Sequence, residues 1–274
     1  MALARRAISP GSIDGAMGSQ TRLALREFQG RNHLPATGVL DPPTRALITL
    51  ESPPLTVYTV TADDLGRLQP LGKTWLEKSR QTALDFESEL ELVGEFSHAS
   101  PALIRQLNPG VDWPTPPAGT TLQVPAVRYP EPSDKAAVVI IHLGGKYLEA
   151  LDGASNLLAH FPCSIAARVE KRPVGSLKVV VVAPHPNYTF DPAVFPESPE
   201  AQRLGRKLLL PAGPNNPVGV AWLSLDRPGY GIHGTPAPEQ VGRTESHGCF
   251  RLTNWDAAYL LQLAWVGLPV EVEP

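Results

Sequence analysis

The sequence predicts an α+β protein built from a small helical bundle, a small α/β unit and a mostly-β, sandwich-like domain. The chain has 274 residues, enough for two or three small domains, and 42% of them are hydrophobic, as in ordinary globular proteins. Its 30 prolines interrupt the chain too often for long helices, because each interior proline removes a backbone donor. Apolar β-branched runs follow residue 133, which places the β-rich part last.

Composition excludes several classes of protein. The net charge of −3 and the pI near 6.2 argue against a nucleic-acid binder, which needs a clustered basic surface. No apolar stretch of about 20 residues is present, so we expect no membrane span. Residues 1–10 lack the apolar core of a signal peptide, and the chain as given is expected to be soluble. Two cysteines allow one disulfide at most, and no Cys/His cluster has zinc-ligand spacing.

Residues 1–50 are expected to form the helical unit. Ser19 can cap a helix whose apolar face includes Ala24, Leu25 and Phe28, and residues 44–50 form a second helix. The segment PGSIDGAMGSQTRLALREFQGRNHLPATGVLDPPTRALI resembles the peptidoglycan-binding three-helix module found beside many cell-wall enzymes. Its first helix would be short, at residues 2–7. The alternative is a helical spacer that binds no ligand.

Residues 55–127 are expected to form the α/β unit. A strand at residues 57–60 leads to Thr61, with Asp63 and Asp64 at a helix start. The closing segment SPALIRQLNPGVDWPTPPAGTTLQVP resembles the second half of a LysM module, whereas residues 66–96 are an insertion that a standard LysM lacks. The resemblance implies glycan binding. A domain that only orients its neighbour would look the same.

Residues 133–274 are expected to form the mostly-β domain. Strands are predicted at residues 136–142, 178–182, 218–225 and 229–233. One helix follows, capped by Thr253 with Asp256 in a capping-box position, and it ends at Gly267 before a last strand.

The segment GYGIHGTPAPEQVGRTESHGCFRLTNWDAAYL carries the chemistry. It holds His233 and, after twelve intervening residues, Ser246-His247-Gly248-Cys249. A thiol is a strong nucleophile only as thiolate, and a nearby histidine can take its proton and form an ion pair with it. The glycine beside the thiol lets backbone amides approach a developing oxyanion.

This spacing resembles the L,D-transpeptidase catalytic domain of the YkuD type. The likeness extends to FPCSIAARVEKRPVG at 161–175, LPAGPNNPVGVAWLSL at 210–225 and GLPVEV at 267–272. It implies that Cys249 attacks the stem peptide between its third residue and the terminal D-Ala. His233 would be the general base, oriented by a backbone carbonyl such as that of Gly234, and the amides of Gly248 and Cys249 would hold the oxyanion. Arg251 would bind a substrate carboxylate. No metal or organic cofactor is implied, and carbapenems should acylate the thiol.

Several residues have a second interpretation. His247 could replace His233 as the base, although the family pattern favours a loop-fixing role, and Ser246 fits a hydrogen bond within the loop. Arg251 could form a structural ion pair, and Tyr230 or Trp222 could line the cleft or fill the core. Cys163 is expected to pack in a strand, and the remaining histidines are expected at the surface or in the core. Ala166-Ala167 and Arg172 depart from the family pattern, which leaves substrate preference open.

The leading function is transpeptidation that forms 3-3 crosslinks between stem peptides. Water as acceptor would give an L,D-carboxypeptidase, and a protein lysine would give an attachment enzyme. A wall-binding protein without activity and an unrelated cysteine peptidase are the other classes, the latter disfavoured because His233 precedes Cys249. Peptidoglycan stem peptides and glycan are the implied partners, which requires a periplasmic or other extracytoplasmic, cell-wall location.

Overall fold

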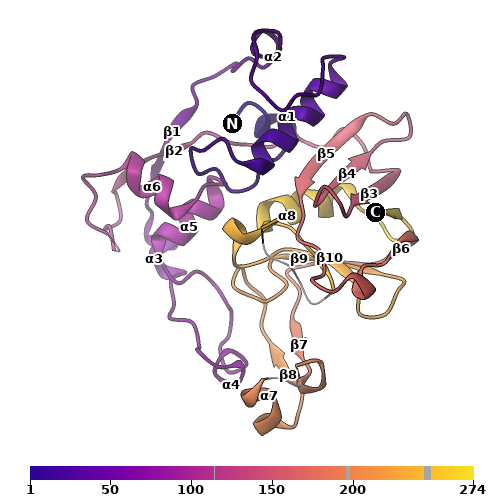
Figure 1. Cartoon of the computed structure of the whole chain (residues 1–274). Helices are drawn as coiled ribbons and strands as arrows, with labels where there is room; N and C mark the ends of the chain where they lie inside the picture. Colours follow the sequence, from indigo (N-terminus) through magenta and orange to yellow (C-terminus); the bar gives the residue numbers. More distant parts are fainter. Residues whose placement is uncertain (114, 196–197, 244–247) are drawn as a thin grey trace.

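The computed structural model describes residues 1–113, 115–195, 198–243 and 248–274 (Figure 1). The helices are short, as the prolines predict. They are η1 (Ala4–Arg6), α1 (Ser19–Arg31), α2 (Pro42–Leu47), α3 (Ala62–Gly66), α4 (Trp75–Lys78), α5 (Glu89–Phe96), α6 (Pro101–Leu107), η2 (Val169–Lys171), η3 (Pro192–Val194), α7 (Pro199–Leu204), η4 (Pro238–Gln240) and α8 (Asn254–Leu263). The strands are β1 (Leu55–Thr59), β2 (Thr121–Pro125), β3 (Val138–His142), β4 (Tyr147–Leu151), β5 (Leu157–Pro162), β6 (Gly175–Pro184), β7 (Tyr188–Phe190), β8 (Leu208–Leu210), β9 (Ala221–Leu225), β10 (Gly231–His233), β11 (Phe250–Arg251) and β12 (Pro269–Glu273).

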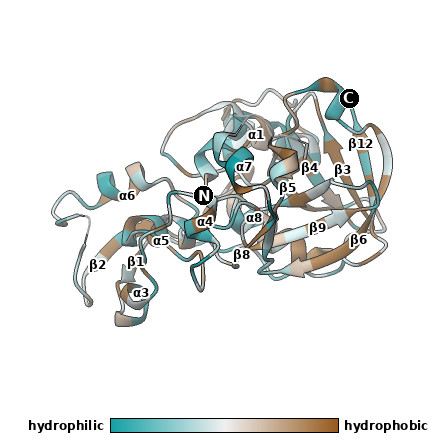
Figure 2. Cartoon of the chain, turned by 90° about the horizontal axis from the view of Figure 1, so that it is seen from below, coloured by the Kyte–Doolittle hydropathy of each residue, from teal (hydrophilic) through white to brown (hydrophobic). Residues whose placement is uncertain are grey.

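Within the described residues, the C-terminal part is built on one eight-stranded mixed sheet with the order β11-β10-β9-β6-β12-β3-β4-β5. The long strand β6 joins its two halves, since residues 175–178 pair with β12 and residues 179–184 pair with β9. A register shift between Val179 and Val181 lies at this change of partner, where an irregularity bends a strand. Figure 2 shows hydrophobic residues along β4 and β6. The α+β class, with a helical N-terminal region and a mostly-β domain, is confirmed.

Helix α8 supplies one side of the main core. It contacts β6, β9 and β10, and Leu260 and Leu263 are fully buried with the strand side chains. Thr253 caps it by accepting a hydrogen bond from the Asp256 amide, as predicted. In a capping box the Asp256 carboxylate would also accept a hydrogen bond from the Thr253 amide. Here the buried carboxylate accepts hydrogen bonds from Tyr129 and Ser9 instead. Two long-range partners have taken the place of the local one.

The N-terminal helices follow the predicted order with shifted ends. The N-cap of α1 is Gly18, so Ser19 is the first helical residue and not the cap. The second helix begins at Pro42, two residues before its predicted start, because Asp41 caps it through the Thr44 amide. The first helix is a 3-10 turn. The segment after it joins the edge of the large sheet, where Ile8 pairs with His160 of β5.

The second unit has β1 and β2 as an antiparallel pair, with α3, α5 and α6 beside it. Thr61 caps α3 in a capping box with Asp64, as the sequence pattern predicts. Part of the predicted insertion, residues 66–88, leaves this unit and reaches the tip formed by β7, α7 and β8 (Figure 1).

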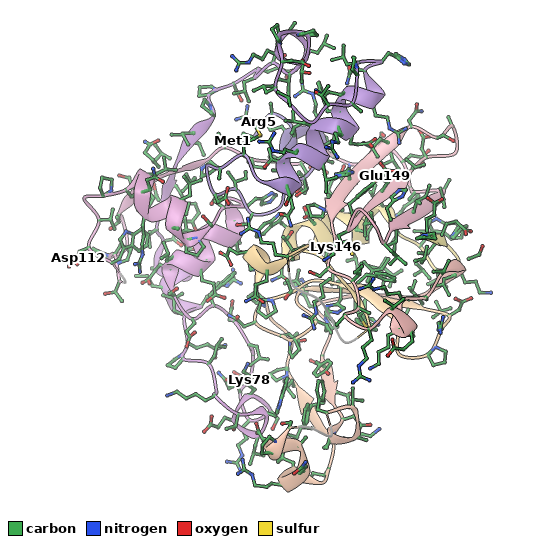
Figure 3. The ribbon with its side chains drawn as sticks, viewed as in Figure 1. Met1, Arg5, Lys78, Asp112, Lys146 and Glu149 are labelled. Carbon is green, nitrogen blue, oxygen red and sulfur yellow. The ribbon has the colours of Figure 1, made fainter. Side chains whose placement is uncertain are left out.

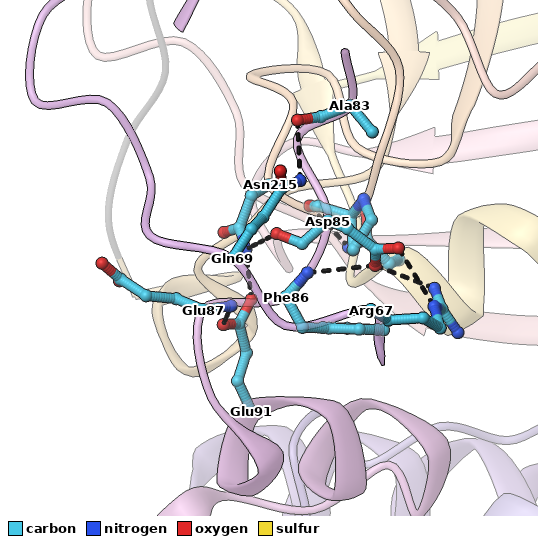
Figure 4. Close-up of polar contacts among 10 residues, drawn as sticks. Arg67, Gln69, Ala83, Asp85, Phe86, Glu87, Glu91 and Asn215 are labelled. Atoms are coloured by element: carbon cyan, nitrogen blue, oxygen red, sulfur yellow. Dashed lines mark hydrogen bonds and ion pairs between the residues drawn. The ribbon is translucent and has the colours of Figure 1, made fainter. Parts of the chain in front are cut away.

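The insertion is attached to the C-terminal domain along its length. Figure 4 shows the Asn215 side chain donating hydrogen bonds to the Asp85 carbonyl and the Glu91 carboxylate. The Leu84 amide bonds to the Ala212 carbonyl at 2.9 Å. At the tip, the Trp75 ring stacks on Phe190 with 4.5 Å between ring centroids. The insertion and the tip β7-α7-β8 therefore share one apolar cluster.

Among the helices of the described residues, none is long and apolar enough to span a bilayer. This agrees with the absence of a 20-residue apolar stretch in the sequence.

Candidate active site

Strands β10 and β11 bring the predicted catalytic residues together. They pair in parallel, with Ile232 beside Phe250 and His233 beside Arg251. The buried side chains of Ile232 and Phe250 belong to the core, so the alternation along each strand sends His233 and Arg251 to the other face. Cys249 directly precedes β11. The far edge of β11 is held by Ser164, which exchanges two backbone hydrogen bonds with Arg251 at 2.9 and 3.0 Å.

His233 is fixed in orientation and is nearly fully buried. Its Nδ1 lies 2.6 Å from the Gly234 carbonyl oxygen, and its ring stacks on Trp222 at 5.5 Å between centroids. A carbonyl can only accept, so Nδ1 carries the proton and Nε2 keeps its lone pair. Burial lowers the pKa of His233 to about 4, assisted by the Arg251 charge and opposed by the Gly234 bond. The imidazole is therefore neutral at pH 7.

Cys249 is half-buried, and its thiol donates a weak hydrogen bond to the Gly229 carbonyl at 3.5 Å. Burial raises the pKa of this thiol above its usual value, although a backbone hydrogen bond and the Arg251 charge oppose the shift. The two pKa directions together favour a neutral thiol beside a neutral imidazole. The resting state thus differs from the thiolate–imidazolium ion pair that the sequence suggested, and proton transfer belongs to the attack itself.

Alkylation of Cys249 should reveal this resting state. Iodoacetamide reacts only with the thiolate, whose fraction rises about tenfold per pH unit while the pH stays below the pKa. Because the pKa of the Cys249 thiol is raised, we expect the alkylation rate to increase steadily between pH 6 and 8. Intact-mass measurement of the alkylated protein gives this rate. The Cys249→Ala protein gives the background from the buried Cys163. A rate that stays level across this range would establish an ion pair instead.

A cleft of 350 Å³ opens over these residues. Its floor includes His233, Gly248, Cys249 and Arg251, so the structure brings four of the predicted residues into one cavity. The opposite wall comes from the tip and the insertion, through Trp75, Tyr188, Val194 and Phe195. Arg251 is half-buried, and its positive charge interacts electrostatically with Cys249 and Tyr188. Burial lowers the pKa of the Arg251 guanidinium. The cleft therefore combines a thiol, a base, a cation and an aromatic wall.

The remaining predicted residues are placed differently. Gly234 holds His233 through its carbonyl and does not line the cleft. Tyr230 packs against the main core, with the Arg227 guanidinium 4.9 Å from its ring centroid, whereas Trp222 lines the cleft. Ser246 and His247 lie outside the described residues. Cys163 is fully buried, as predicted, and it forms no disulfide with Cys249.

Comparison with protein families gives two matches. The L,D-transpeptidase catalytic domain (YkuD) matches residues 92–272, more than half of the chain. The chain belongs to the L,D-transpeptidase family. A putative peptidoglycan-binding domain also matches residues 1–48. The resemblances of residues 1–50 and of the C-terminal domain are thus confirmed, whereas neither match shows the LysM-like resemblance of residues 55–127.

Individual relatives of the L,D-transpeptidase family differ in coverage. The putative L,D-transpeptidase YkuD of Bacillus licheniformis is 26% identical over 183 residues, covering 67% of this chain and 92% of that protein. The probable L,D-transpeptidase YbiS of Escherichia coli K12 is 31% identical over 169 residues, covering 61% of this chain and 54% of that protein. The chain thus spans about half of the latter. A solved L,D-transpeptidase from Mycobacterium smegmatis aligns at 19% identity and a TM-score of 0.40, over 58% of this chain and 76% of that one.

Sequence reasoning missed part of this candidate site. Trp75, Tyr188 and Phe195 carry no motif, and only the long insertion within the second unit signals that something is added there. Asn254 was also missed. Its side chain accepts a hydrogen bond from Val220 and donates one to Pro214, and Gly219, at φ +62°, leaves no room for a Cβ against it. This contact fixes the loop that leads into β9.

Proposed function

We propose that this chain is a peptidoglycan L,D-transpeptidase with Cys249 as its nucleophile. The observation that carries the proposal is the cleft that joins Cys249 to a buried, neutral His233 and to Arg251. A neutral imidazole with Nδ1 tethered to Gly234 has one free lone pair, on Nε2, to receive a proton. The family supplies the substrate class, a tetrapeptide stem of peptidoglycan.

In the first half-reaction, Cys249 Sγ attacks the carbonyl that joins the third stem residue to the terminal D-Ala. His233 Nε2 takes the thiol proton as the C–S bond forms, which avoids a free thiolate in the buried site. Backbone amides at Gly248 and Cys249 receive the oxyanion. The imidazolium then gives its proton to the departing D-Ala nitrogen, and a thioester remains on Cys249.

In the second half-reaction, the amine of an acceptor stem attacks the thioester carbonyl. His233 accepts the amine proton and returns a proton to the departing thiol, which restores the neutral pair. The product is an amide between two third-position residues, a 3-3 crosslink. Arg251 supplies a cation on the cleft floor for the carboxylate of the terminal D-Ala. No step needs a metal or an organic cofactor.

Mass spectrometry of a purified tetrapeptide muropeptide incubated with the protein tests this proposal. Dimers linked through two third-position residues, absent with Cys249→Ala, are the expected result. Loss of D-Ala without dimers would transfer the assignment to an L,D-carboxypeptidase, with water as the acceptor. If neither product forms with several stem types, the catalytic proposal fails and a wall-binding role is left.

The N-terminal units are proposed to hold the enzyme on its substrate. The peptidoglycan-binding domain that matches residues 1–48 supports this for the first unit (residues 1–50). For the second (residues 55–127), the LysM-like pairing of β1 and β2 around α3, α5 and α6 supports glycan binding. The two N-terminal units and the catalytic unit at 133–274 would all act on peptidoglycan, which implies an extracytoplasmic, cell-wall location for the protein.

Trp75 is proposed to form part of the substrate-binding wall. It stacks on Phe190 and Phe195 at 4.5 and 6.0 Å between ring centroids and lines the cleft opposite Cys249. A ring that covers about 40 Å² of apolar surface in the bound stem peptide contributes about 1 kcal/mol to binding. We therefore expect Trp75→Ala to raise KM for the stem peptide about three- to tenfold, with a smaller change in kcat, in a steady-state D-Ala release assay. Trp75→Phe should retain most of the binding. Equal KM values for all three proteins would remove Trp75 from the site.

A further inference from the structure

A second cluster of ionisable side chains lies where α1 meets the large sheet. In the register of β4 and β5, Glu149 lies directly opposite His160, and in that of β3 and β4, His142 lies opposite Tyr147. Tyr147 and Glu149 are two residues apart, so they share one face of β4. Helix α1 contacts β5 and brings Glu27 to this face. Figure 3 labels Glu149 at this junction, beside α1.

His160 is the least satisfied member of the cluster. It is 1% exposed, and within the described part of the chain neither of its ring nitrogens has a hydrogen-bond partner. Its Nδ1 lies 3.8 Å from Glu149 Oε1, which is too far for a hydrogen bond. A buried imidazole without partners is costly, because its nitrogens lose their hydrogen bonds to water. A group bound by both His160 and Glu149 would give one of these nitrogens the partner that it lacks.

Two carboxyl groups of the cluster lie close to each other and to His160. Glu149 is nearly buried, and Glu27 comes close enough for the two acids to interact. Two neighbouring carboxylates cannot both ionise at low cost unless a proton or a cation lies between them. One ligand atom from each of Glu27, Glu149 and His160 lies within 4.8 Å of the others.

The outer oxygens of both carboxylates are already held in place. Arg31 Nε contacts Glu27 Oε1 at 2.6 Å, and His142 Nε2 lies 3.3 Å from Glu149 Oε2. Each contact leaves the other oxygen of its carboxylate for the cluster. Side chains that bind a metal are commonly oriented by hydrogen bonds to a further group, as these two carboxylates are. His142 is in turn fixed by Glu273, 3.3 Å from its Nδ1.

We propose that Glu27, Glu149 and His160 bind one divalent transition-metal ion of the zinc class. One imidazole and two carboxylates form a donor set that suits zinc, whose bonds of about 2.0–2.2 Å require ligand atoms somewhat closer together than 4.8 Å. The ion would join α1 of the first unit to β4 and β5 of the catalytic unit. It has a structural role, independent of the proposed transpeptidation. Its ligands are spread from residue 27 to residue 160, which is why no sequence spacing indicates it.

Metal titration of the full-length Cys249→Ala protein tests the site, since this substitution removes the cleft thiol as a competing ligand. After treatment with a chelator, calorimetric titration with Zn²⁺ should give one ion per chain, and Co²⁺ should give visible absorption bands of a protein-bound ion. Adding Glu27→Gln should weaken binding by at least about tenfold. Glu51→Gln, at an exposed glutamate, is the matched control and should bind like the parent.

A thermal readout makes the test independent of folding defects. Glu27 lies on the half-exposed side of α1, so Glu27→Gln should melt like the parent while chelator is present. Zn²⁺ should raise the melting temperature of the parent and of Glu51→Gln, but not that of Glu27→Gln. Absence of saturable binding, or binding unchanged by Glu27→Gln, would overturn the proposal and leave a cluster that shares a proton.

Discussion

Replacing Cys249 by alanine is expected to abolish acyl transfer, lowering the rate of D-Ala release by about 10⁵- to 10⁶-fold, as when other nucleophilic residues are removed. The cleft has the base, the cation and the aromatic wall in place, but without the thiol no covalent bond to the donor stem can form. Chromatographic assay of released D-Ala measures the rate. Intact-mass analysis after incubation with a carbapenem measures acylation directly, and no adduct is expected on Cys249→Ala.

The matched control for this experiment is Cys163→Ala. Cys163 is fully buried, and burial raises the pKa of its thiol far above the usual value, so it is not a nucleophile. Its variant should retain activity and form the same carbapenem adduct, with some loss of stability from the smaller side chain. Acylation that persists in Cys249→Ala and disappears in Cys163→Ala would invalidate the assignment of the nucleophile.

Replacing His233 by glutamine should lower kcat/KM about 10²- to 10⁴-fold, the usual contribution of a positioned base. Glutamine can still donate a hydrogen bond to the Gly234 carbonyl, but it cannot take the thiol proton. The measurement is the pH dependence of kcat/KM. In the native protein the acid limb should lie near pH 4, where His233 becomes protonated and stops accepting a proton.

In His233→Gln that acid limb should disappear, and the remaining rate should rise with pH as the Cys249 thiol ionises unaided. His33→Asn, at an exposed histidine, should leave both the rate and the profile unchanged. A profile for His233→Gln that keeps the native acid limb would mean that another group, such as His247, is the base.

The sequence predicted those parts of the fold whose signals are local. Thr61 and Thr253 cap helices where expected, since the side chain and the amide it binds lie three residues apart. The floor of the candidate cleft was predicted in the same way, because one short segment holds both His233, at the end of β10, and Cys249, directly before the neighbouring strand β11. Asp256 shows the limit. It has the spacing of a capping box, but its carboxylate binds Tyr129 and Ser9, which only the folded chain brings near.

The aromatic wall of the cleft could not be predicted from the sequence either, because its residues meet only in the folded chain. Trp75 and Tyr188 come from separate units, and their rings meet at 6.3 Å between centroids because the insertion runs along the catalytic domain. Short-range patterns such as helix caps and strand alternation do not predict where the segment of residues 66–88 packs. The same holds for the buried His160, whose environment depends on the docking of α1 against β5.

The segment around Ile8 has a kinetic consequence for folding. The Ser9 amide donates a hydrogen bond to the His160 carbonyl at 2.8 Å, and the Ser9 hydroxyl reaches Asp256, 247 residues further along the chain. The residues joined by these contacts are far apart in the sequence. Such contacts form late in folding, because closing a long loop costs chain entropy before the contacts can compensate for it. During synthesis, Ser9 must therefore wait for its partner Asp256 until helix α8 has been made. A fragment of residues 1–127 would lack both partners, so its edge segment would remain undocked until the catalytic unit was supplied.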